Sequence, residues 1–274
     1  MNEATKQFYD KIENEHKFLF HHDNVTEGSG KYTRKKHYHN LFEVYYFTGG
    51  ECRYFIDNKS YQLSPGDIVL IPEGVIHNSE YGNTVHSRML INCSHKFIPS
   101  SVRPMLPQML HIYRNPEITD EINRIFSLIE EEYTKPDGFS EDVLSCYTHM
   151  LFILLARNMD NRSSTSTGNA CIEQAIDYIK ENFTSNITLP DMATMFYVSP
   201  EHFSRLFKKE TGFNFSEYIN MLRLQKAEAM LKKTSASVAE IASECGFNDS
   251  NYFSIRFKNM YGISPKKLQI TSKK

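Results

Sequence analysis

The sequence has few cysteines, no long apolar run and no large excess of charge of either sign. Its five cysteines are odd in number, are widely spaced and include no C-x-x-C pair, so we expect free thiols in a reducing cytosol. The longest apolar run, Met150–Ala156, is far shorter than the roughly 20 residues that a membrane-spanning helix needs. The first residues are polar and of mixed charge, which predicts no signal peptide. We therefore expect a cytoplasmic protein with no disulfide framework and no part in a membrane.

The length of 274 residues indicates two domains, and the two parts of the chain differ in charge. Residues 1–167 carry 17 basic and 22 acidic side chains, whereas residues 168–274 carry 14 basic and 11 acidic ones. The apolar fraction of 40% is ordinary for a globular protein. A net positive charge in the second part suits a surface that binds phosphate groups, although so small an excess does not identify the partner by itself.

One structural unit occurs twice in the last part of the chain. Each copy begins with four apolar residues at i, i+3, i+4 and i+7, which form one face of a short helix. These residues are Leu189, Met192, Ala193 and Phe196 in the first copy and, 49 positions later, Val238, Ile241, Ala242 and Cys245 in the second. Thr188 stands three residues before Asp191, and Ser237 stands three residues before Glu240. This is the spacing of a capping box, which predicts where each helix begins.

A second helix follows each of these short helices. Ser199 and Pro200 start the first one, with a hydroxyl at the N-cap and proline at the first helical position, and Asp249 starts the other. Four positions then repeat with an offset of 50: Phe203 and Phe253, Phe207 and Phe257, Lys208 and Lys258, and Gly212 and Gly262. Two helices joined by a tight turn, with polar residues outside the second helix, form a helix-turn-helix.

A longer helix from about Ser216 to Lys233 is expected between the two units. Its buried stripe consists of Met221, Leu224, Ala227 and Leu231. At about 1.5 Å per residue it spans roughly 27 Å, which is close to one turn of B-DNA. The second helices of the two units are therefore spaced to enter successive major grooves.

The tandem units resemble the DNA-binding domain of AraC/XylS-type transcription regulators. The resemblance covers residues 188–262, and its motifs are Ser199-Pro200, Phe203-Ser204-Arg205-Leu206-Phe207-Lys208-Lys209-Glu210-Thr211-Gly212, Ile241-Ala242, Gly246-Phe247, Tyr252-Phe253-Ser254 and Phe257-Lys258. The helical pattern alone is also compatible with a small helical domain that binds no partner. The resemblance implies that the partner is double-stranded promoter DNA.

The same resemblance implies which residues contact the DNA. Base edges are contacted by Glu201, Ser204 and Arg205 in the first unit and by Ser250, Asn251, Ser254 and Ile255 in the second. Phosphate contacts fall to Lys208, Lys209, Lys258, Lys266 and Lys267. Arg205 suits a bidentate contact to guanine, and the alternative is a surface charge or a phosphate contact. The second unit departs from the family pattern, because Ile255 replaces an arginine and can touch only a thymine methyl group.

The first half of the chain has the pattern of short strands. The residues His37, His39, Leu41, Glu43, Tyr45 and Phe47 alternate along one face of a strand. Turns are indicated at Asn58-Lys59, Pro65-Gly66-Asp67 and Pro72-Glu73-Gly74. Many short strands with regular turns predict a sandwich or barrel. Residues 3–20 are expected to form a short helix before it.

The strand region resembles the two motifs of the cupins. The matching residues are His37, His39 and Glu43, followed by Gly66, Pro72, Gly74 and His77. In metal-binding cupins the positions of His37, His39, Glu43 and His77 are the ligands, so a divalent metal is one hypothesis, although no cofactor is required. A second hypothesis is a small polar effector such as a sugar, with Tyr45 as a stacking face. A third is a buried polar network with a structural role only.

After the strands the pattern becomes helical. Ile118–Tyr133 is amphipathic, and the helix around Val143–Leu155 is apolar nearly all round, which predicts a homodimer contact. We expect an α+β protein of two domains. Residues 1–158 form a cupin-like β-barrel with trailing helices for effector binding and dimerisation, 159–169 form a linker, and 170–274 form the all-α DNA-binding domain.

The function that this organisation predicts is that of a ligand-responsive, sequence-specific transcription regulator. The alternative is a metal-dependent cupin enzyme with an accessory DNA-binding domain. The sequence contains no positioned nucleophile, so we expect no enzyme.

Overall fold

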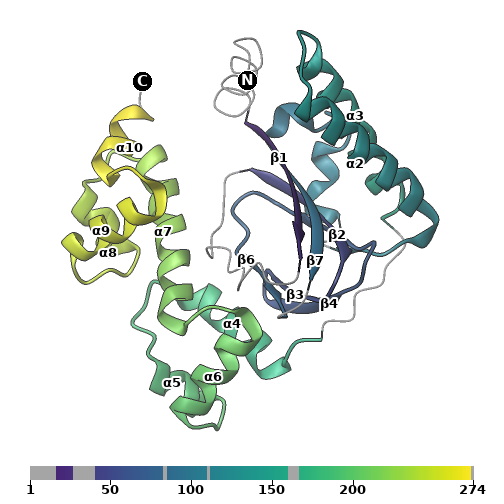
Figure 1. Ribbon diagram of the computed structural model, residues 1–274. Coiled ribbons are helices and arrows are strands. Elements are labelled where there is room, and N and C mark those ends of the chain that lie inside the picture. The colour runs from purple at the N-terminus through teal and green to yellow at the C-terminus, as the bar shows by residue number, and fades with distance from the viewer. Residues whose placement is uncertain (1–16, 27–40, 83–84, 110–111, 160–166, 273–274) are drawn as a thin grey trace. The chain divides into compact units, whose positions relative to one another are not determined.

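A computed structural model describes residues 17–26, 41–82, 85–109, 112–159 and 167–272. The chain divides between Thr167 and Gly168 into two compact units, the first rich in strands and the second helical (Figure 1). The predicted α+β fold with two domains is confirmed. Within these ranges no helix is both long and apolar enough to cross a membrane.

Two antiparallel sheets build the N-terminal unit. The larger has the order β1-β7-β2-β5-β8, and the smaller has the order β4-β3-β6. The strands are β1 (Phe18–Val25), β2 (Phe42–Gly49), β3 (Cys52–Ile56), β4 (Lys59–Leu63), β5 (Ile68–Ile71), β6 (His77–Tyr81), β7 (His86–Cys93) and β8 (Ile112–Tyr113). The helix expected over residues 3–20 is wrong at its end, because β1 begins at Phe18; the rest of that range lies outside the described residues.

Successive side chains of strand β2 point alternately into two different apolar cores. Phe42, Val44 and Tyr46 belong to a cluster on one side, whereas Tyr45 and Phe47 belong to a cluster on the other. The second cluster joins these residues to side chains of the smaller sheet, so the two sheets pack face to face. The strands are therefore buried on both faces, which is why the apolar run Ile68–Ile71 is continuous.

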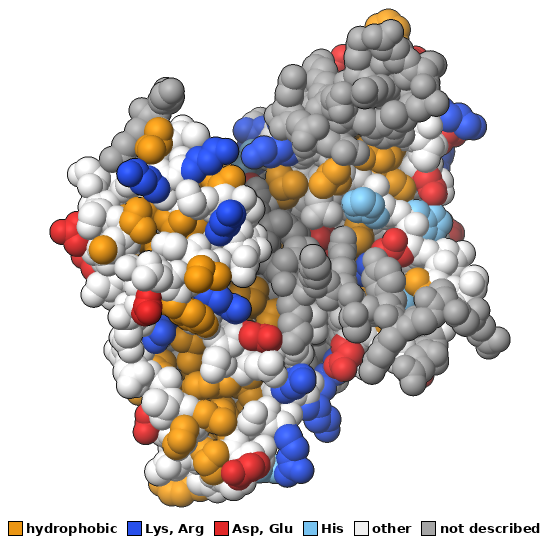
Figure 2. Space-filling view, turned by 60° about the vertical axis from the view of Figure 1, so that its left-hand side comes forward, with side chains coloured by type: hydrophobic (Ala, Val, Ile, Leu, Met, Phe, Trp, Pro, Cys, Tyr) orange, Lys and Arg blue, Asp and Glu red, His pale blue; other side chains and the backbone are white. Residues whose placement is uncertain are grey.

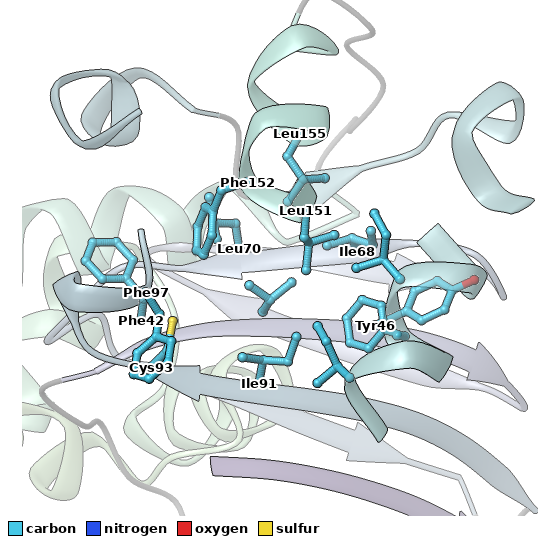
Figure 3. Close-up of a cluster of buried hydrophobic side chains, with 14 of the residues drawn as sticks. Phe42, Tyr46, Ile68, Leu70, Ile91, Cys93, Phe97, Leu151, Phe152 and Leu155 are labelled. Atoms are coloured by element: carbon cyan, nitrogen blue, oxygen red, sulfur yellow. The ribbon is translucent and has the colours of Figure 1, made fainter. Parts of the chain in front are cut away.

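Two helices cover the outer face of the larger sheet. They are α2 (Thr119–Thr134) and α3 (Ser140–Arg157), and three short 3-10 turns, η2 (His95–Phe97), η3 (Arg103–Gln108) and η4 (Pro116–Ile118), lead to them. Leu151, Phe152 and Leu155 of α3 point toward Leu70 and Ile68 of the sheet (Figure 3). One face of α3 thus completes the core of its own domain.

The C-terminal unit contains two helix-turn-helix pairs separated by a long helix. Its helices are α4 (Ala170–Asn182), α5 (Leu189–Met195), α6 (Pro200–Thr211), α7 (Phe215–Lys233), α8 (Val238–Glu244), α9 (Ser250–Tyr261) and α10 (Pro265–Thr271). The predicted capping boxes at Thr188 and Ser237 are present, and Ser199 and Asp249 cap α6 and α9. The predicted stripe of α7 is buried, with Leu224 2% and Ala227 0% exposed.

Candidate functional site

The second helices of the two pairs, α6 and α9, present the same arrangement of side chains. Phe203 and Phe207 of α6 are fully buried, as are Phe253 and Phe257 of α9, so these rings fix which face of each helix is turned outward. N-cap side chains hold the start of both helices. The hydroxyl of Ser199 accepts from the N–H of His202 at 3.2 Å, and the carboxylate of Asp249 accepts from two N–H groups.

The residues predicted to contact bases lie on the outward faces. Those classed as exposed are Glu201, Arg205, Ser250, Asn251 and Ile255, and Ser204 and Ser254 are half-buried. The hydroxyl of Ser254 donates to the carbonyl of Ser250 at 2.9 Å, which leaves its oxygen as an acceptor. The side chain of Ile255 is 60% exposed, an unusual position for isoleucine in the absence of a partner.

Basic residues lie around these two faces. The predicted phosphate contacts Lys208, Lys209, Lys258, Lys266 and Lys267 are all exposed. On the face drawn in Figure 2, the basic side chains lie spread among polar and apolar ones. Such scattered cations suit contacts to several phosphates along a backbone.

Sequence reasoning missed Tyr252 on α9, whose side chain is 46% exposed. Its hydroxyl accepts from the amide of Asn220 on α7 at 3.2 Å, and the guanidinium of Arg256 lies 6.0 Å from its ring centroid. The matching position in the first unit is His202, so the repeat itself pointed to an outward-facing side chain here.

In the N-terminal unit, three of the five predicted pocket residues are described. Glu43 and Tyr45 share one face of β2 and are 1% and 0% exposed, and His77 at the start of β6 is 6% exposed. The ring of His77 stacks on Tyr54 at 6.3 Å, and the ring of Tyr45 meets Tyr54 edge-on at 4.9 Å. Tyr45 and His77 therefore both pack against Tyr54. His37 and His39 lie outside the described residues.

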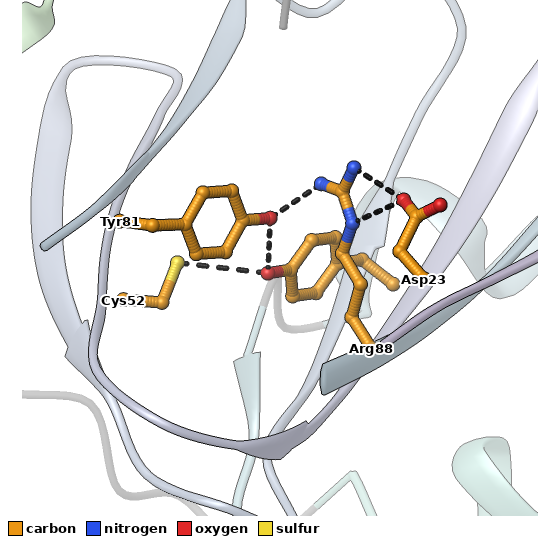
Figure 4. A network of polar contacts seen from close by, with 5 residues as sticks. Asp23, Cys52, Tyr81 and Arg88 are labelled. Atoms are coloured by element: carbon orange, nitrogen blue, oxygen red, sulfur yellow. Dashed lines mark hydrogen bonds and ion pairs between the residues drawn. The ribbon is translucent and has the colours of Figure 1, made fainter. Parts of the chain in front are cut away.

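A buried polar network occupies the space between the sheets (Figure 4). The Nε and Nη2 atoms of Arg88 donate to Oδ2 of Asp23 at 2.9 and 2.6 Å, and Nη1 donates to the hydroxyl of Tyr81. The hydroxyls of Tyr81 and Tyr45 are hydrogen-bonded at 2.8 Å, and the Tyr45 hydroxyl lies 3.5 Å from Sγ of Cys52. Asp23, Arg88, Tyr81 and Cys52 were not predicted as site residues.

Burial keeps the thiol and the tyrosine hydroxyl of this network protonated, whereas Asp23 pairs with Arg88 as a carboxylate. Burial raises the pKa of the Cys52 thiol to about 12 and that of the Tyr81 hydroxyl to about 12. The guanidinium of Arg88, itself 0% exposed, lies 5.7 Å from the centroid of the Tyr45 ring and 5.2 Å from that of Tyr81. Its charge is thus paired with Asp23 and lies close to two aromatic rings.

Over the described part of the chain, no group of three or more His, Cys, Asp and Glu side chains is placed to hold a metal ion. Two of the four predicted ligands, His37 and His39, lie outside that part. The metal hypothesis for His37, His39, Glu43 and His77 therefore stays a prediction.

Comparison with known proteins identifies both units. Residues 192–269 match the helix-turn-helix domain family, and residues 26–145 match the AraC-like ligand binding domain family. The HTH-type transcriptional activator RhaS of Escherichia coli is 24% identical over 245 residues, which cover 85% of this chain and 87% of that protein.

Two solved structures are also similar. Apo ToxT from Vibrio cholerae is 16% identical, with 92% of this chain and 97% of that chain covered and a TM-score of 0.39. The C-terminal domain of the response regulator AraT from Geobacillus stearothermophilus is 33% identical over 39% of this chain and 88% of that chain, with a TM-score of 0.37. The two family matches, together with the likeness to an activator over most of the chain, show that this protein belongs to the AraC-type transcription regulators, with an N-terminal ligand-binding domain and a C-terminal helix-turn-helix domain.

Proposed function

We propose that this regulator reads a promoter with α6 and α9 and that a small polar effector in the N-terminal domain controls it. The observation that supports the DNA contacts is the matched outward faces of the two helices. Glu201, Ser204 and Arg205 contact base edges in one major groove, and Ser250, Asn251, Ser254 and Ile255 contact them in the next. Lys208, Lys209, Lys258, Lys266 and Lys267 contact phosphates.

Arg205 and Lys208 test this division of roles, because they lie one turn apart on α6. Arg205→Ala should weaken binding to the preferred site by about 1–3 kcal/mol and relax the base preference there. Lys208→Ala should weaken binding to every sequence alike and lower the salt slope by about one. Fluorescence anisotropy on a duplex selected from random DNA and on an unselected duplex measures both effects. Equal losses for Arg205→Ala on the two duplexes would remove Arg205 as a base reader.

The effector binds among the polar groups between the two sheets. His37, His39, Glu43, Tyr45 and His77 contact it, and the hydroxyl of Tyr81 extends the same polar surface. Arg88 is already neutralised by Asp23, so an anionic ligand would have to compete with that carboxylate. The chemistry therefore favours a neutral molecule with several hydroxyl groups, such as a sugar, which can exchange hydrogen bonds with tyrosine hydroxyls.

Tyr45 and Tyr46 form a matched pair for testing the effector site. The Tyr45 hydroxyl belongs to the network between the sheets, whereas the Tyr46 hydroxyl donates to Asn123 of α2 at 2.6 Å on the other face of β2. A neutral sugar or polyol that binds should stabilise the wild type by about 2.7 kcal/mol at a hundredfold excess over its dissociation constant. Tyr45→Phe should reduce this thermal shift and Tyr46→Phe should leave it unchanged.

The same thermal-shift experiment also tests the competing metal hypothesis. Stoichiometric zinc, nickel or manganese in the purified protein, with a melting temperature that falls on chelation, would assign His37, His39, Glu43 and His77 to a metal. Absence of a shift with every sugar, polyol and metal would leave the network a structural one.

The regulator also acts as a homodimer through the outer face of α3. Leu151 is fully buried in its own domain, so one side of this apolar helix packs on the sheet and only the opposite side is available for a dimer contact. The outward stripe consists of Cys146, Met150 and Ile153, and Met150 and Ile153 are 49% and 36% exposed. Apolar side chains aligned along one exposed helix face suit a symmetric contact.

A further inference from the structure

Helix α7 carries a row of polar side chains that bonds to the second helix-turn-helix pair. The amide of Asn220 donates to the hydroxyl of Tyr252 at 3.2 Å, and Nζ of Lys226 donates to the carbonyl of Glu244 at 3.2 Å. Arg223 lies between them on the same face, because positions three residues apart are neighbours on a helix. The hydrogen bonds of Arg223 differ from those of Asn220 and Lys226, because the acceptors of Arg223 lie in the first half of the DNA-binding unit.

Arg223 joins the two halves of the DNA-binding unit. Its Nε donates to the carbonyl of Phe183 at 2.7 Å, and its Nη2 donates to the carbonyl of Ser185 at 2.8 Å. Both carbonyls lie in the corner between α4 and α5, which leads directly into the first helix-turn-helix pair. The guanidinium also lies 5.9 Å from the ring centroid of Phe247, at the turn between α8 and α9. One side chain of α7 thus donates hydrogen bonds to the segment before the first pair and lies against a ring of the second pair.

Gly246 lets the same corner approach the turn of the second pair directly. Its φ is +87°, and a Cβ atom there would lie 2.5 Å from the carbonyl oxygen of Thr184 and 3.0 Å from Nε of Arg223. The equivalent turn residue of the first pair, 49 positions earlier, is Tyr197, which has φ 56° and is 96% exposed. The side chain at this turn of the first pair therefore extends into solvent, whereas the same place at the second pair is occupied by the backbone of Thr184.

The corner extends to the start of α9. Thr184 and Asn186 line a common pocket with Gly246, Phe247 and Ser250, the first residue of that helix. Movement of the corner would therefore change the position of α9 relative to α5 and α6. A helix such as α7 fixes the distance between the loops at its ends, whereas the orientation of the helices beyond those loops needs further contacts.

We infer that Arg223 and Gly246 form a clamp that fixes α9 relative to α6 and thereby sets the spacing between the two DNA sequences that the protein reads. This inference rests on the proposed reading of bases by α6 and α9. Two linked binding modules gain affinity only when both engage at once, and a rigid link restricts that gain to one spacing. Arg223 is a positioning residue: it need not touch DNA to select the spacing.

The test compares spacings for the full-length protein. A composite site is first selected from random duplex DNA with the wild type, and duplexes are then made with the two boxes moved apart or together by one to three base pairs. The wild type should lose about tenfold or more in affinity away from its preferred spacing. Arg223→Met should lose about tenfold at the preferred spacing and less than twofold elsewhere, so that the preference flattens.

Lys226→Met is the matched control, because it removes the same charge from the same face of α7. The hydrogen bond that this variant loses is the one from Lys226 to the second pair. It should lower affinity by one common factor at all spacings. A parallel loss for Arg223→Met would overturn the clamp and make Arg223 an ordinary cation. Arg223→Lys keeps the charge but cannot donate to both carbonyls in the same geometry, so the clamp predicts the same flattened spacing preference as for Arg223→Met.

A pair of glycine variants keeps the test independent of Arg223. Gly246 and Gly262 both have positive φ, but a Cβ atom at Gly262 meets nothing within 4 Å. Gly246→Ala should shift or flatten the spacing preference, whereas Gly262→Ala should lower the melting temperature and keep the preference. Equal preferences in the two variants would contradict the clamp. If selection with the wild type returned no two-box site, the proposed base reading by α6 and α9 would fail first.

Discussion

Replacing Asp23 with alanine should lower the free energy of unfolding of the N-terminal domain by about 3–5 kcal/mol. The guanidinium of Arg88 is completely buried, and Asp23 accepts two of its hydrogen bonds. Without that carboxylate the buried guanidinium loses the acceptor of these two hydrogen bonds and the negative charge that they bring to it. Urea unfolding followed by tyrosine fluorescence measures the change, and binding of the C-terminal unit to DNA reports that the rest of the chain is folded.

The double variant Asp23→Ala with Arg88→Met distinguishes a charge effect from general damage. It removes the buried charge as well, so it should be more stable than Asp23→Ala alone. Glu130→Ala is the matched control. It breaks the 2.8 Å hydrogen bond between Oε1 of Glu130 and Nδ1 of His22 on β1, two side chains that are 35% and 31% exposed, and it should cost under about 1 kcal/mol. A loss for Asp23→Ala as small as that for Glu130→Ala would contradict the role given to the pair.

The double variant Met150→Glu with Ile153→Glu should be monomeric. Both side chains lie on the exposed stripe of α3, and a two-fold axis would bring the four carboxylates of a dimer close together. Dimer affinity should fall at least a hundredfold, or about 2.7 kcal/mol. Because Leu151, Phe152 and Leu155 still hold α3 to the sheet, the fold of the domain should survive.

Light scattering at micromolar concentration measures this effect. Met105→Glu, at a side chain that is 37% exposed on η3, is the control and should leave the dimer intact. A wild type that is monomeric under these conditions would contradict the interface, whatever the variants do.

The helical unit was predictable from the sequence because its signals are local. The capping boxes at Thr188 and Ser237 lie within three residues of the groups they bond, and the buried positions repeat within single helices. Because the unit occurs twice, the role predicted for a position in one copy could be checked against the matching position in the other. The clamp gave no such signal, because Arg223 bonds to backbone carbonyls of Phe183 and Ser185, which any residues would provide.

The central strands of the N-terminal domain were predictable, but neither β1, which was expected to be helical up to residue 20, nor the pairing between the strands was. Asp23 and Arg88 face each other in the register between β1 and β7, 65 positions apart in the chain. The alternation of side chains within a strand shows which residues share a face, but it does not show which residue of another strand lies opposite. The network was therefore missed. For α3 the sequence showed apolar residues all round, and only the position of the sheet decides that Leu151 turns inward and Met150 outward.

The central claim is that the full-length protein recognises a particular DNA sequence through both helix-turn-helix pairs. Its most direct test measures dissociation constants for the duplex selected by the wild type and for a scrambled duplex of the same composition, at several salt concentrations. We predict that the selected duplex binds at least about a thousandfold more tightly at physiological salt and that both affinities fall as salt rises. Equal affinity for the two duplexes at every salt concentration would contradict the claim.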